Sequence, residues 1–165
     1  AVSPWALAEL RINCRNTREI AEFVRNFGGG VSASASPEGD PVKIITVNDE
    51  AEFIESVLTA VRRAYVAQGS NAAEVVVITG TAAERNLFYN LQSAEFMFCK
   101  WEDRSEQLVA CETVKRAKGI EAGHVIFATL DEGLRDNEMY VGASRARTDL
   151  VIIGPKSFRN RFSFN

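Results

Sequence analysis

Four long apolar segments constrain the fold of this chain more than any other feature. Each is apolar nearly throughout instead of alternating, which is typical of parallel strands covered on both faces. We therefore expect a mostly parallel sheet buried between two layers. The four segments are VKIITV (Val42 to Val47), EVVVITG (Glu74 to Gly80), HVIFATL (His124 to Leu130) and DLVIIG (Asp149 to Gly154), and a shorter candidate strand is LRIN (Leu10 to Asn13).

The segments between these runs have the periodicity of amphipathic helices. Apolar residues recur every three to four positions, which places them on one stripe of a helix. Strands that alternate with helices predict an α/β domain with right-handed crossover connections. The predicted helices are NTREIAEFVRNF (16–27), EAEFIESVLTAVRRAYVA (50–67) and AAERNLFYNLQ (82–92), and the small-residue segment 28–40 predicts an exposed loop.

Length and composition are those of one ordinary globular domain. The chain has 165 residues, of which 46% are apolar and 25% charged, and this excludes collagen-like, disordered and membrane-spanning classes. We expect a single domain over residues 1–165 that is a fragment of a longer chain. Its first residues, AVSPWALAEL, contain neither an initiator methionine nor a signal-like apolar stretch.

Charge and cysteine content limit the expected partners and compartment. The formal net charge is -3, so any contact with DNA or RNA must come from a local patch and not from an overall basic field. Three cysteines, Cys14, Cys99 and Cys111, and a single histidine fit neither a disulfide framework nor a zinc site, so no metal site is predicted. A cytoplasmic location is expected.

No complete nucleotide-binding motif is present. Ligands of open α/β sheets gather at the carboxyl ends of the strands, so a site is expected just after the apolar runs. The sequence has no Gly-Lys pair, which excludes a G-x-x-x-x-G-K-[ST] phosphate loop, and no G-x-G-x-x-G follows a strand. Asp131 and Glu132 follow one run as magnesium-binding acids do, yet without a phosphate loop a solvated turn is the simpler interpretation. A self-contained nucleotide enzyme using these two acids stays an alternative.

Three other segments become informative together: LRINCRNTREIAEFV (10–24), CETVKRAKGIEAGHVIFATLDEG (111–133) and MYVGASRARTDLVIIG (139–154). In this order and spacing they resemble motifs IV, V and VI of superfamily 1 helicases of the UvrD/Rep type. That family writes motif V around A-K-G-L-E and motif VI around Y-V-x-x-T-R-A-R, where this chain has 117–121 and 140–147. The resemblance implies the second RecA-like motor domain, a three-layer α/β sandwich of the P-loop NTPase type that lacks its own phosphate loop. The chain resembles a compact variant of this domain, because only about twenty residues separate Leu91 from Cys111, where UvrD and Rep carry a large accessory insertion.

The resemblance implies a nucleotide site shared with another domain. Arg145 is similar to the arginine finger of motif VI, and Arg15 is similar to the motif IV arginine that also approaches the γ-phosphate. Glu121 resembles the acid that hydrogen-bonds the ribose, and Gly119 would let the backbone approach the ligand. A guanidinium suits the finger role because it is permanently charged and forks onto phosphate oxygens. This interpretation requires Arg145, Arg15 and Glu121 to lie on the same side of the sheet.

Structural alternatives exist for each of these residues. Arg145 could be an ordinary surface arginine in a salt bridge, Arg15 a capping residue at a strand end, and Glu121 a carboxylate at a helix start. If the segment 140–147 is helical, Arg145 and Arg147 differ by about 200° around the axis and cannot both point into one cleft. Small residues at 142–144 and 146 would let that helix lie close against its neighbours.

The same resemblance implies a track for single-stranded DNA. Thr113 is similar to the motif V threonine that contacts a backbone phosphate, and basic residues follow it, where the family's usual His-Ser is replaced by Lys115-Arg116. A solvated charge cluster is the alternative. The candidate nucleic-acid-binding residues are Thr113, Lys115, Arg116, Lys118, Thr79 and Thr81, whereas the aromatic residues Phe88, Tyr89, Phe96 and Phe98 and also His124 are expected in the core or at strand edges.

The function implied by the resemblance is that of the C-terminal motor domain of an ATP-dependent DNA helicase or translocase. The chain would supply arginine fingers and part of the single-stranded DNA track to an ATP site shared with an N-terminal RecA-like domain of the same parent chain. ATP and Mg²⁺ are the expected cofactors, with Mg²⁺ held mainly by that other domain, and no membrane is expected as a partner. The alternative is a non-catalytic module with a helicase-like fold that binds nucleic acid or protein.

Overall fold

A parallel sheet lies at the centre of the computed structural model, which describes residues 15–28, 35–69, 71–91 and 95–163. The sheet has six strands in the order β1-β6-β5-β2-β4-β3, and every neighbouring pair is parallel. The strands are β1 (Lys43–Val47), β2 (Val75–Thr79), β3 (Met97–Cys99), β4 (Leu108–Thr113), β5 (Ala122–Ala128) and β6 (Ala146–Pro155). The predicted α/β class with a buried parallel sheet is confirmed.

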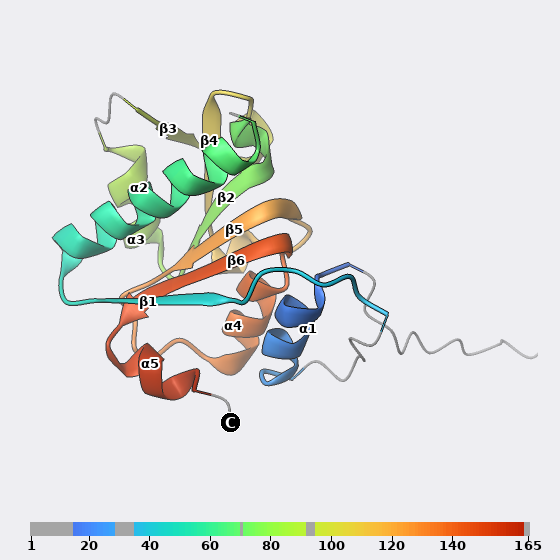
Figure 1. Cartoon of the computed structure of the whole chain (residues 1–165). Coiled ribbons are helices and arrows are strands. Elements are labelled where there is room, and N and C mark those ends of the chain that lie inside the picture. Colours follow the sequence, from blue (N-terminus) through green and yellow to red (C-terminus); the bar gives the residue numbers. More distant parts are fainter. Residues whose placement is uncertain (1–14, 29–34, 70, 92–94, 164–165) are drawn as a thin grey trace, which may run out of the picture.

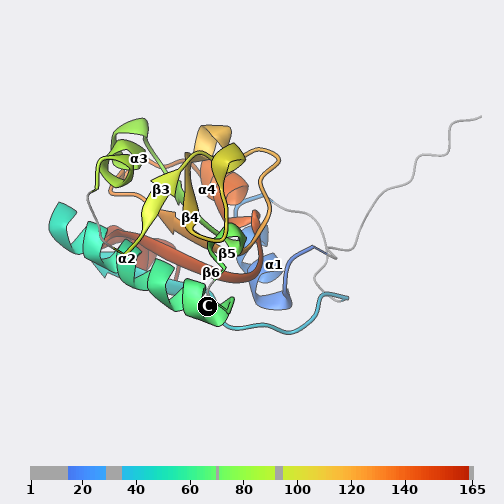
Figure 2. The same cartoon turned by 90° about the horizontal axis from the view of Figure 1, so that it is seen from above.

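Helices cover both faces of the sheet (Figure 1). On one face lie α2 (Glu50–Ala67) and α3 (Ala82–Tyr89), and on the other lie α1 (Arg18–Arg25), α4 (Asp136–Ala143) and α5 (Ser157–Arg161). Seen from above, α2 lies along the β6 side of the sheet and α3 along the β3 and β4 side (Figure 2). This is the three-layer arrangement that the sequence predicts.

Each face of the sheet has its own apolar core. The core under α1, α4 and α5 contains Ile20, Phe127 and Met139, all at most 1% exposed. The core under α2 and α3 contains Phe53 and Phe88, and the aromatic residues expected in the core lie there as buried or partly buried side chains. These apolar contacts are what hold the three layers together.

The four long apolar runs all form strands, with shifts at their ends. The second run begins one residue later than predicted as β2, β5 begins at Ala122 instead of His124, and β6 begins at Ala146 instead of Asp149. Strands β3 and β4 are not predicted because β3 has only three residues and β4 ends in the polar pair Glu112 and Thr113. The candidate strand 10–13 lies outside the described residues.

The three predicted helices form as α1, α2 and α3. Asp49 caps α2 by accepting a hydrogen bond from the Glu52 amide, and Thr81 and Glu84 form a reciprocal capping box at the start of α3. Helices α4 and α5 are not predicted, because α4 has a glycine, Gly142, near its end and α5 has only five residues. Residues 35–40 of the predicted loop contain neither helix nor strand, and Ser36 among them is buried.

The connection from β4 to β5 shapes the surface that the site occupies. Strand β2 lies between β4 and β5, so the chain must cross one face of the sheet to return to its amino-terminal edge. It does so through residues 114–121, which contain a single 3₁₀ turn, Val114–Arg116, and no α-helix. Val114, Ala117 and Ile120 anchor this crossover segment in the core below α1 and α4. Among the described residues no helix is long and apolar enough to cross a membrane.

Candidate functional site

Arg15, Glu121 and Arg145 come together at the amino-terminal end of the parallel strands, although they are far apart in the sequence. Arg15 Nε lies 2.9 Å from Glu121 Oε1, and the charges of both residues act on the Arg145 guanidinium. Glu121 directly precedes β5 and Arg145 directly precedes β6. The three residues therefore lie at the amino-terminal ends of these strands, and the expectation of a site at the carboxyl ends is wrong for them.

Arg145 is held at the end of α4 by short-range contacts. Its Nε donates to Val141 O at 2.9 Å, and its Nη2 donates to Ser144 Oγ at 2.9 Å. Partial burial lowers the pKa of Arg145, and the charge of Arg15 lowers it further, whereas Glu121 and Tyr140 act in the opposite direction. An arginine keeps its charge under such conditions, so the group remains a desolvated cation.

The segment 140–147 is not one helix. Helix α4 ends at Ala143 and strand β6 begins at Ala146, so Arg145 lies in the turn and Arg147 in the strand. Arg147 Nη2 lies 2.6 Å from Glu74 Oε2, in a salt bridge away from Arg15. The two arginines diverge as expected, but the cause is the change from helix to strand and not their spacing around a helix axis.

A side chain that the sequence patterns do not single out organises this turn. Asn16 is 3% exposed, and its Nδ2 donates to Ser144 O at 3.1 Å and also to Ala146 O. The next residue, Thr17, donates its amide to Arg147 O at 3.0 Å. The signal that could have found Asn16 is a polar residue between a candidate strand and an amphipathic helix, directly after Arg15.

A basic groove leads from Arg145 along the crossover segment. It has a volume of about 460 Å³ and lies between residues 114–118 and helix α4 with its preceding turn. Its side chains include the cations Lys115, Lys118, Arg135 and Arg145. Glu138 is the acidic residue of the lining, and a hydrogen bond from Arg135 lowers its pKa. The groove therefore has a net positive charge, which suits an anion such as a polyphosphate.

Arg116 faces away from this groove towards a buried acid. Its Nε lies 3.4 Å from Oε2 of Glu112, a residue that is 1% exposed, and Trp101 N donates to the other carboxylate oxygen at 3.2 Å. The charge of Glu112 also acts on Tyr89: the pKa of Tyr89 is raised to about 12, first by burial and second by this charge. Arg116 thus serves as the counter-charge of Glu112 in this structure, and Lys115 and Lys118 are the basic residues of the crossover segment that line the groove.

The three candidate threonines lie at the carboxyl ends of β2 and β4. Thr79 is fully buried, and its hydroxyl donates to Thr81 O at 2.9 Å. Thr113 is 7% exposed, and the Thr81 hydroxyl accepts the Glu84 amide of the capping box. Thr81 is partly exposed, whereas Thr79 and Thr113 are buried and do not present their side chains to solvent.

Gly119 and Glu121 lie in the turn that leads into β5. Gly119 has a φ of +89°, a conformation that favours glycine, and a Cβ there would meet nothing within 4 Å. Backbone conformation, and not close packing, is therefore the structural reason for glycine at this position. The alternative of a helix-start carboxylate for Glu121 is wrong, because a strand begins at Ala122.

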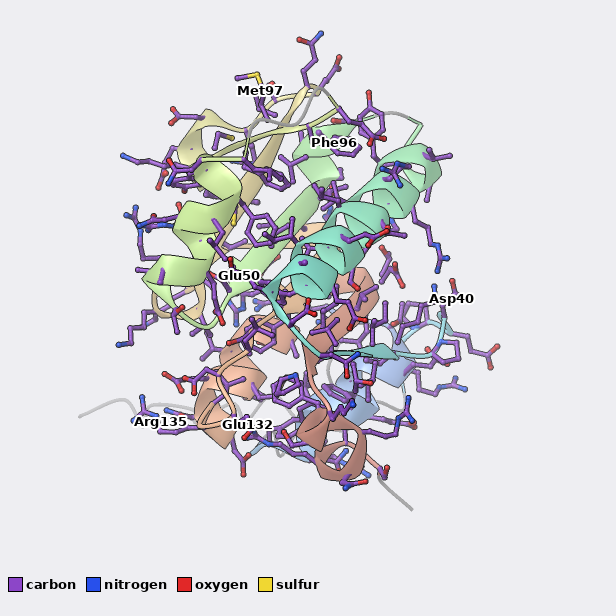
Figure 3. The ribbon with its side chains drawn as sticks, turned by 90° about the vertical axis from the view of Figure 1, so that its left-hand side faces the viewer. Asp40, Glu50, Phe96, Met97, Glu132 and Arg135 are labelled. Carbon is purple, nitrogen blue, oxygen red and sulfur yellow. The ribbon has the colours of Figure 1, made fainter. Side chains whose placement is uncertain are left out.

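Asp131 and Glu132 belong to an exposed turn after β5, as the simpler interpretation predicts. Asp131 Oδ1 accepts the Gly133 amide at 2.8 Å, and Glu132 Oε1 accepts the Ser157 hydroxyl at 3.1 Å. Figure 3 labels Glu132 and Arg135 at the rim of the molecule. In the part of the chain that the structure describes, no group of three or more histidine, cysteine or acidic side chains could hold a metal ion.

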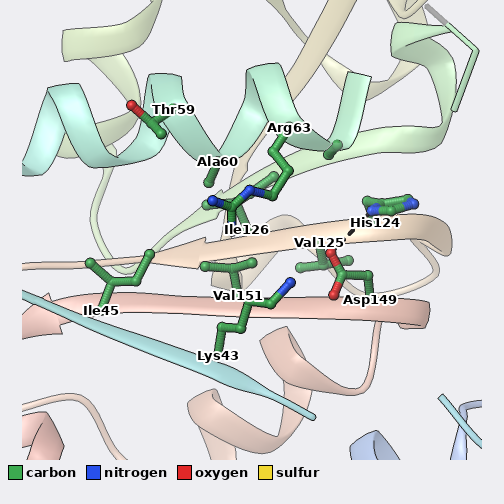
Figure 4. A pocket seen from close by; sticks show the side chains of 11 residues that line it. Lys43, Ile45, Thr59, Ala60, Arg63, His124, Val125, Ile126, Asp149 and Val151 are labelled. Atoms are coloured by element: carbon green, nitrogen blue, oxygen red, sulfur yellow. Dashed lines mark hydrogen bonds and ion pairs between the residues drawn. The ribbon is translucent and has the colours of Figure 1, made fainter. Parts of the chain in front are cut away.

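A second hollow lies under α2, where His124 and Asp149 pair at 3.2 Å (Figure 4). The hydrogen bond from His124 is the main cause that lowers the pKa of Asp149, and Lys43 adds to it. The enclosed cavity has a volume of about 50 Å³, and an open hollow of about 400 Å³ adjoins it and shares Lys43, Arg63, His124 and Asp149. His124 is a buried residue near the amino-terminal end of β5, in agreement with the expected strand-edge role.

Comparisons with known proteins support the resemblance found in the sequence. Residues 108–153, from the start of β4 into β6, match the model of the UvrD-like helicase C-terminal domain family. The chain is also similar to the crystal structure of the C-terminal domain of a possible DNA helicase from Lactobacillus plantarum WCFS1. That match has a TM-score of 0.62 and 20% identity, and it covers 87% of this chain and 88% of the other. No curated protein matches the chain. The family match over residues 108–153 is consistent with the resemblance to UvrD-type helicases, and the structural match confirms the predicted α/β fold.

Proposed function

We propose that this chain is the C-terminal motor domain of an ATP-dependent DNA helicase or translocase and supplies two arginines to an ATP site shared with an N-terminal RecA-like domain. The observation that carries the proposal is the meeting of Arg15, Glu121 and Arg145 at the end of a basic groove. The structural relative, itself the C-terminal domain of a possible DNA helicase, supports it.

The two arginines would act on the transferring γ-phosphoryl group of ATP. Its charge spreads over three oxygens in the transition state, and positioned guanidinium groups stabilise that charge most strongly where water is excluded. Arg145 is already partly buried, so part of its surrounding water is absent before any ligand binds. Glu121, which pairs with Arg15 in this structure, would accept a hydrogen bond from a ribose hydroxyl. Gly119 would bring the backbone close to the nucleotide.

Mg²⁺ and the phosphate loop would come from the other domain. The described residues of this chain offer no suitable group of ligands, and its sequence has no phosphate loop. Mg²⁺ would supply positive charge that neutralises the charge developing on the phosphates. The role left to this chain is to bring Arg145 and Arg15 to the nucleotide when the two domains close.

Single-stranded DNA would pass the carboxyl-terminal edge of β2 and β4. There Thr81 is partly exposed, and Thr79 and Thr113 would contribute through their backbone since their side chains are buried. Lys115, Arg116 and Lys118 follow along the crossover segment and would contact backbone phosphates. Lys115 and Lys118 also line the groove that ends at Arg145, so they lie between the two sites.

The finger role is tested by Arg145→Ala in a protein that joins this chain to its phosphate-loop domain. We expect hydrolysis to fall by about 10³- to 10⁵-fold, or about 4 to 7 kcal/mol of barrier, with ATP affinity unchanged within about tenfold. Steady-state ATPase and equilibrium nucleotide binding measure the two effects.

Arg147→Ala is the matched control for this substitution. It removes the same side chain two positions away, where the guanidinium pairs with Glu74 on the surface. We expect it to leave turnover nearly unchanged. Equal losses in both variants, or normal turnover in Arg145→Ala, would remove the finger assignment.

A further inference from the structure

We infer that Asn16 is a positioning residue whose buried amide fixes Arg145 in register with Arg15. The inference rests on the proposed function, in which both arginines act on one triphosphate. It adds a residue that touches neither ATP nor DNA and acts through the turn between α4 and β6.

The Asn16 amide bridges the two peptide groups that flank Arg145. Its Nδ2 donates to Ser144 O, the residue before Arg145, and to Ala146 O, the residue after it. An amide NH₂ has two donor hydrogens, and both are used in this clamp. Because Asn16 is 3% exposed, water cannot readily take over either contact.

Neighbouring backbone bonds complete the clamp around the turn. Ala122 N donates to Arg145 O at 3.2 Å, and Thr17 N donates to Arg147 O at 3.0 Å. The carbonyls of four successive residues, 144–147, thus accept hydrogen bonds from β5 and from the segment that follows Arg15. Of these donors, the Asn16 amide is the side-chain contribution, so it can be removed by substitution.

The clamp also solves an electrostatic problem. Arg15 and Arg145 repel one another, and Glu121 pairs directly with Arg15. A carboxylate placed on Arg145 would hold it as well but would compete with phosphate for the guanidinium. Asn16 is uncharged and binds the backbone, so it fixes the position of Arg145 and leaves its charge available.

Chain connectivity then sets the spacing of the two cations. Asn16 directly follows Arg15, so the residue that holds the turn of one arginine is bonded to the other. A misplacement of about 1 Å at a reacting group can cost roughly 10²-fold in rate. We therefore expect the loss of the clamp to lower the rate of hydrolysis more than it lowers ATP binding.

The positioning claim can be tested on this chain without any ATPase activity. The probe is the Nε–H signal of Arg145 in ¹⁵N NMR spectra, because this group donates to Val141 O and is half-buried. In Asn16→Ala we expect its hydrogen exchange to accelerate by about tenfold or more, while the Nε–H of Arg147 changes little. An unchanged Arg145 signal in a folded Asn16→Ala chain would overturn the inference.

Two further variants separate positioning from general loss of stability. Asn26→Ala is the matched control, because Asn26 Nδ2 also donates to two backbone carbonyls, Glu22 O and Phe23 O, at the far end of α1. It should leave Arg145 exchange unchanged. Asn16→Asp keeps the shape of the side chain but removes its two N–H donors, so it should behave like Asn16→Ala. It provides a second measurement if the alanine variant does not fold.

The consequence for catalysis is measured in the protein that contains both motor domains. For Asn16→Ala we expect kcat to fall by about 10- to 100-fold and the KM for ATP to change less than about threefold. If Arg145 exchange accelerates but both Asn16→Ala and Arg145→Ala turn over normally, the proposed function fails and the clamp stands. If Arg145→Ala abolishes turnover and Asn16→Ala changes neither kcat nor Arg145 exchange, the inference fails and the proposed function stands.

Discussion

Adjacent side chains at positions 115 and 116 carry the same charge but have different structural roles. Lys115 is exposed and lines the groove, whereas Arg116 neutralises Glu112, whose carboxylate is 2% exposed. A buried carboxylate that loses its counter-charge is strongly destabilising, while an exposed lysine contributes little. Arg116 therefore supports the fold in addition to its proposed contact with a phosphate, whereas Lys115 is simply available to a ligand.

This difference predicts unequal effects on stability. Arg116→Ala should lower the free energy of unfolding by about 1 to 2 kcal/mol, a range reduced for the solvent exposure of Arg116, and Lys115→Ala should change it by less than about 0.5 kcal/mol. Urea denaturation followed by circular dichroism measures both.

Glu112→Gln provides the test of the cause. In the Arg116→Ala background it removes the buried charge, so it should restore part of the lost stability. No recovery in the double variant, or an equal loss in Lys115→Ala, would contradict the role given to Arg116.

The residues of the nucleotide site differ in how far the sequence predicts them. Arg15, Glu121 and Arg145 follow from the resemblance, because charged groups at motif positions leave a readable pattern. Asn16 leaves none, since a single buried amide looks like any loop or cap residue until its acceptors are known. For the same reason the burial of Thr79 and the pairing of Arg116 with Glu112 depend on tertiary contacts.

At the scale of elements, the packing of helix α4 against the sheet positions the turn that carries Arg145. A Cβ built on Gly142 would lie 3.0 to 3.1 Å from ring atoms of Phe127, a residue of β5 that is 1% exposed. The absence of a side chain at Gly142 therefore lets the last turn of α4 pack against the Phe127 ring, in agreement with the expectation of close helix packing.

Gly142→Ala should push α4 away from β5. We expect a net loss of about 1 to 2 kcal/mol in the free energy of unfolding, because overpacking in a buried site outweighs the roughly 1 kcal/mol gain in helix propensity. Thermal or urea unfolding gives the value. In a Phe127→Leu background the same substitution should cost less, and an unchanged cost there would show that the ring contact is not the cause.

The elements that the sequence does not predict are β3, α4 and α5, and also β4, which ends in the polar pair Glu112 and Thr113. The long runs of β1, β2, β5 and β6 and the periodic helices α1, α2 and α3 have enough residues for their pattern to stand out. Strand β3 has three residues, and α4 has eight with a glycine near its end, so tertiary packing decides their conformation. For the same reason, the periodicity of the sequence does not predict the change from helix to strand at 143–146.

At the scale of the whole molecule, a basic groove lies on an acidic chain. The net charge of -3 gives no general attraction for nucleic acid, while four cations gather in the groove. Electrostatic attraction of this kind is local and falls steeply with salt. The fold is similar to that of its structural relative at 20% identity, with a TM-score of 0.62.

We predict that this chain alone folds but does not hydrolyse ATP, because half of the proposed site is absent. Circular dichroism and a coupled ATPase assay with ATP and Mg²⁺ test the two parts. Turnover by the highly purified chain, lost on substitution of Asp131 and Glu132, would favour the self-contained nucleotide enzyme instead.

A non-catalytic binding module can be distinguished from a motor domain by fluorescence anisotropy with single-stranded oligonucleotides at two salt concentrations. A non-catalytic binding module should bind without any other domain. A motor domain should bind weakly until it is joined to its partner.

The crossover segment 114–121 has a mechanical consequence. From Thr113 to Ala122 the backbone can span at most about 30 Å, and the rise of β5 alone uses roughly 20 Å of it. The segment begins with a 3₁₀ turn, and Val114, Ala117 and Ile120 are buried in the core, so it has little freedom to extend. A displacement of the carboxyl end of β4, where single-stranded DNA would lie, should therefore be transmitted through this segment to Glu121 and the arginines beside it.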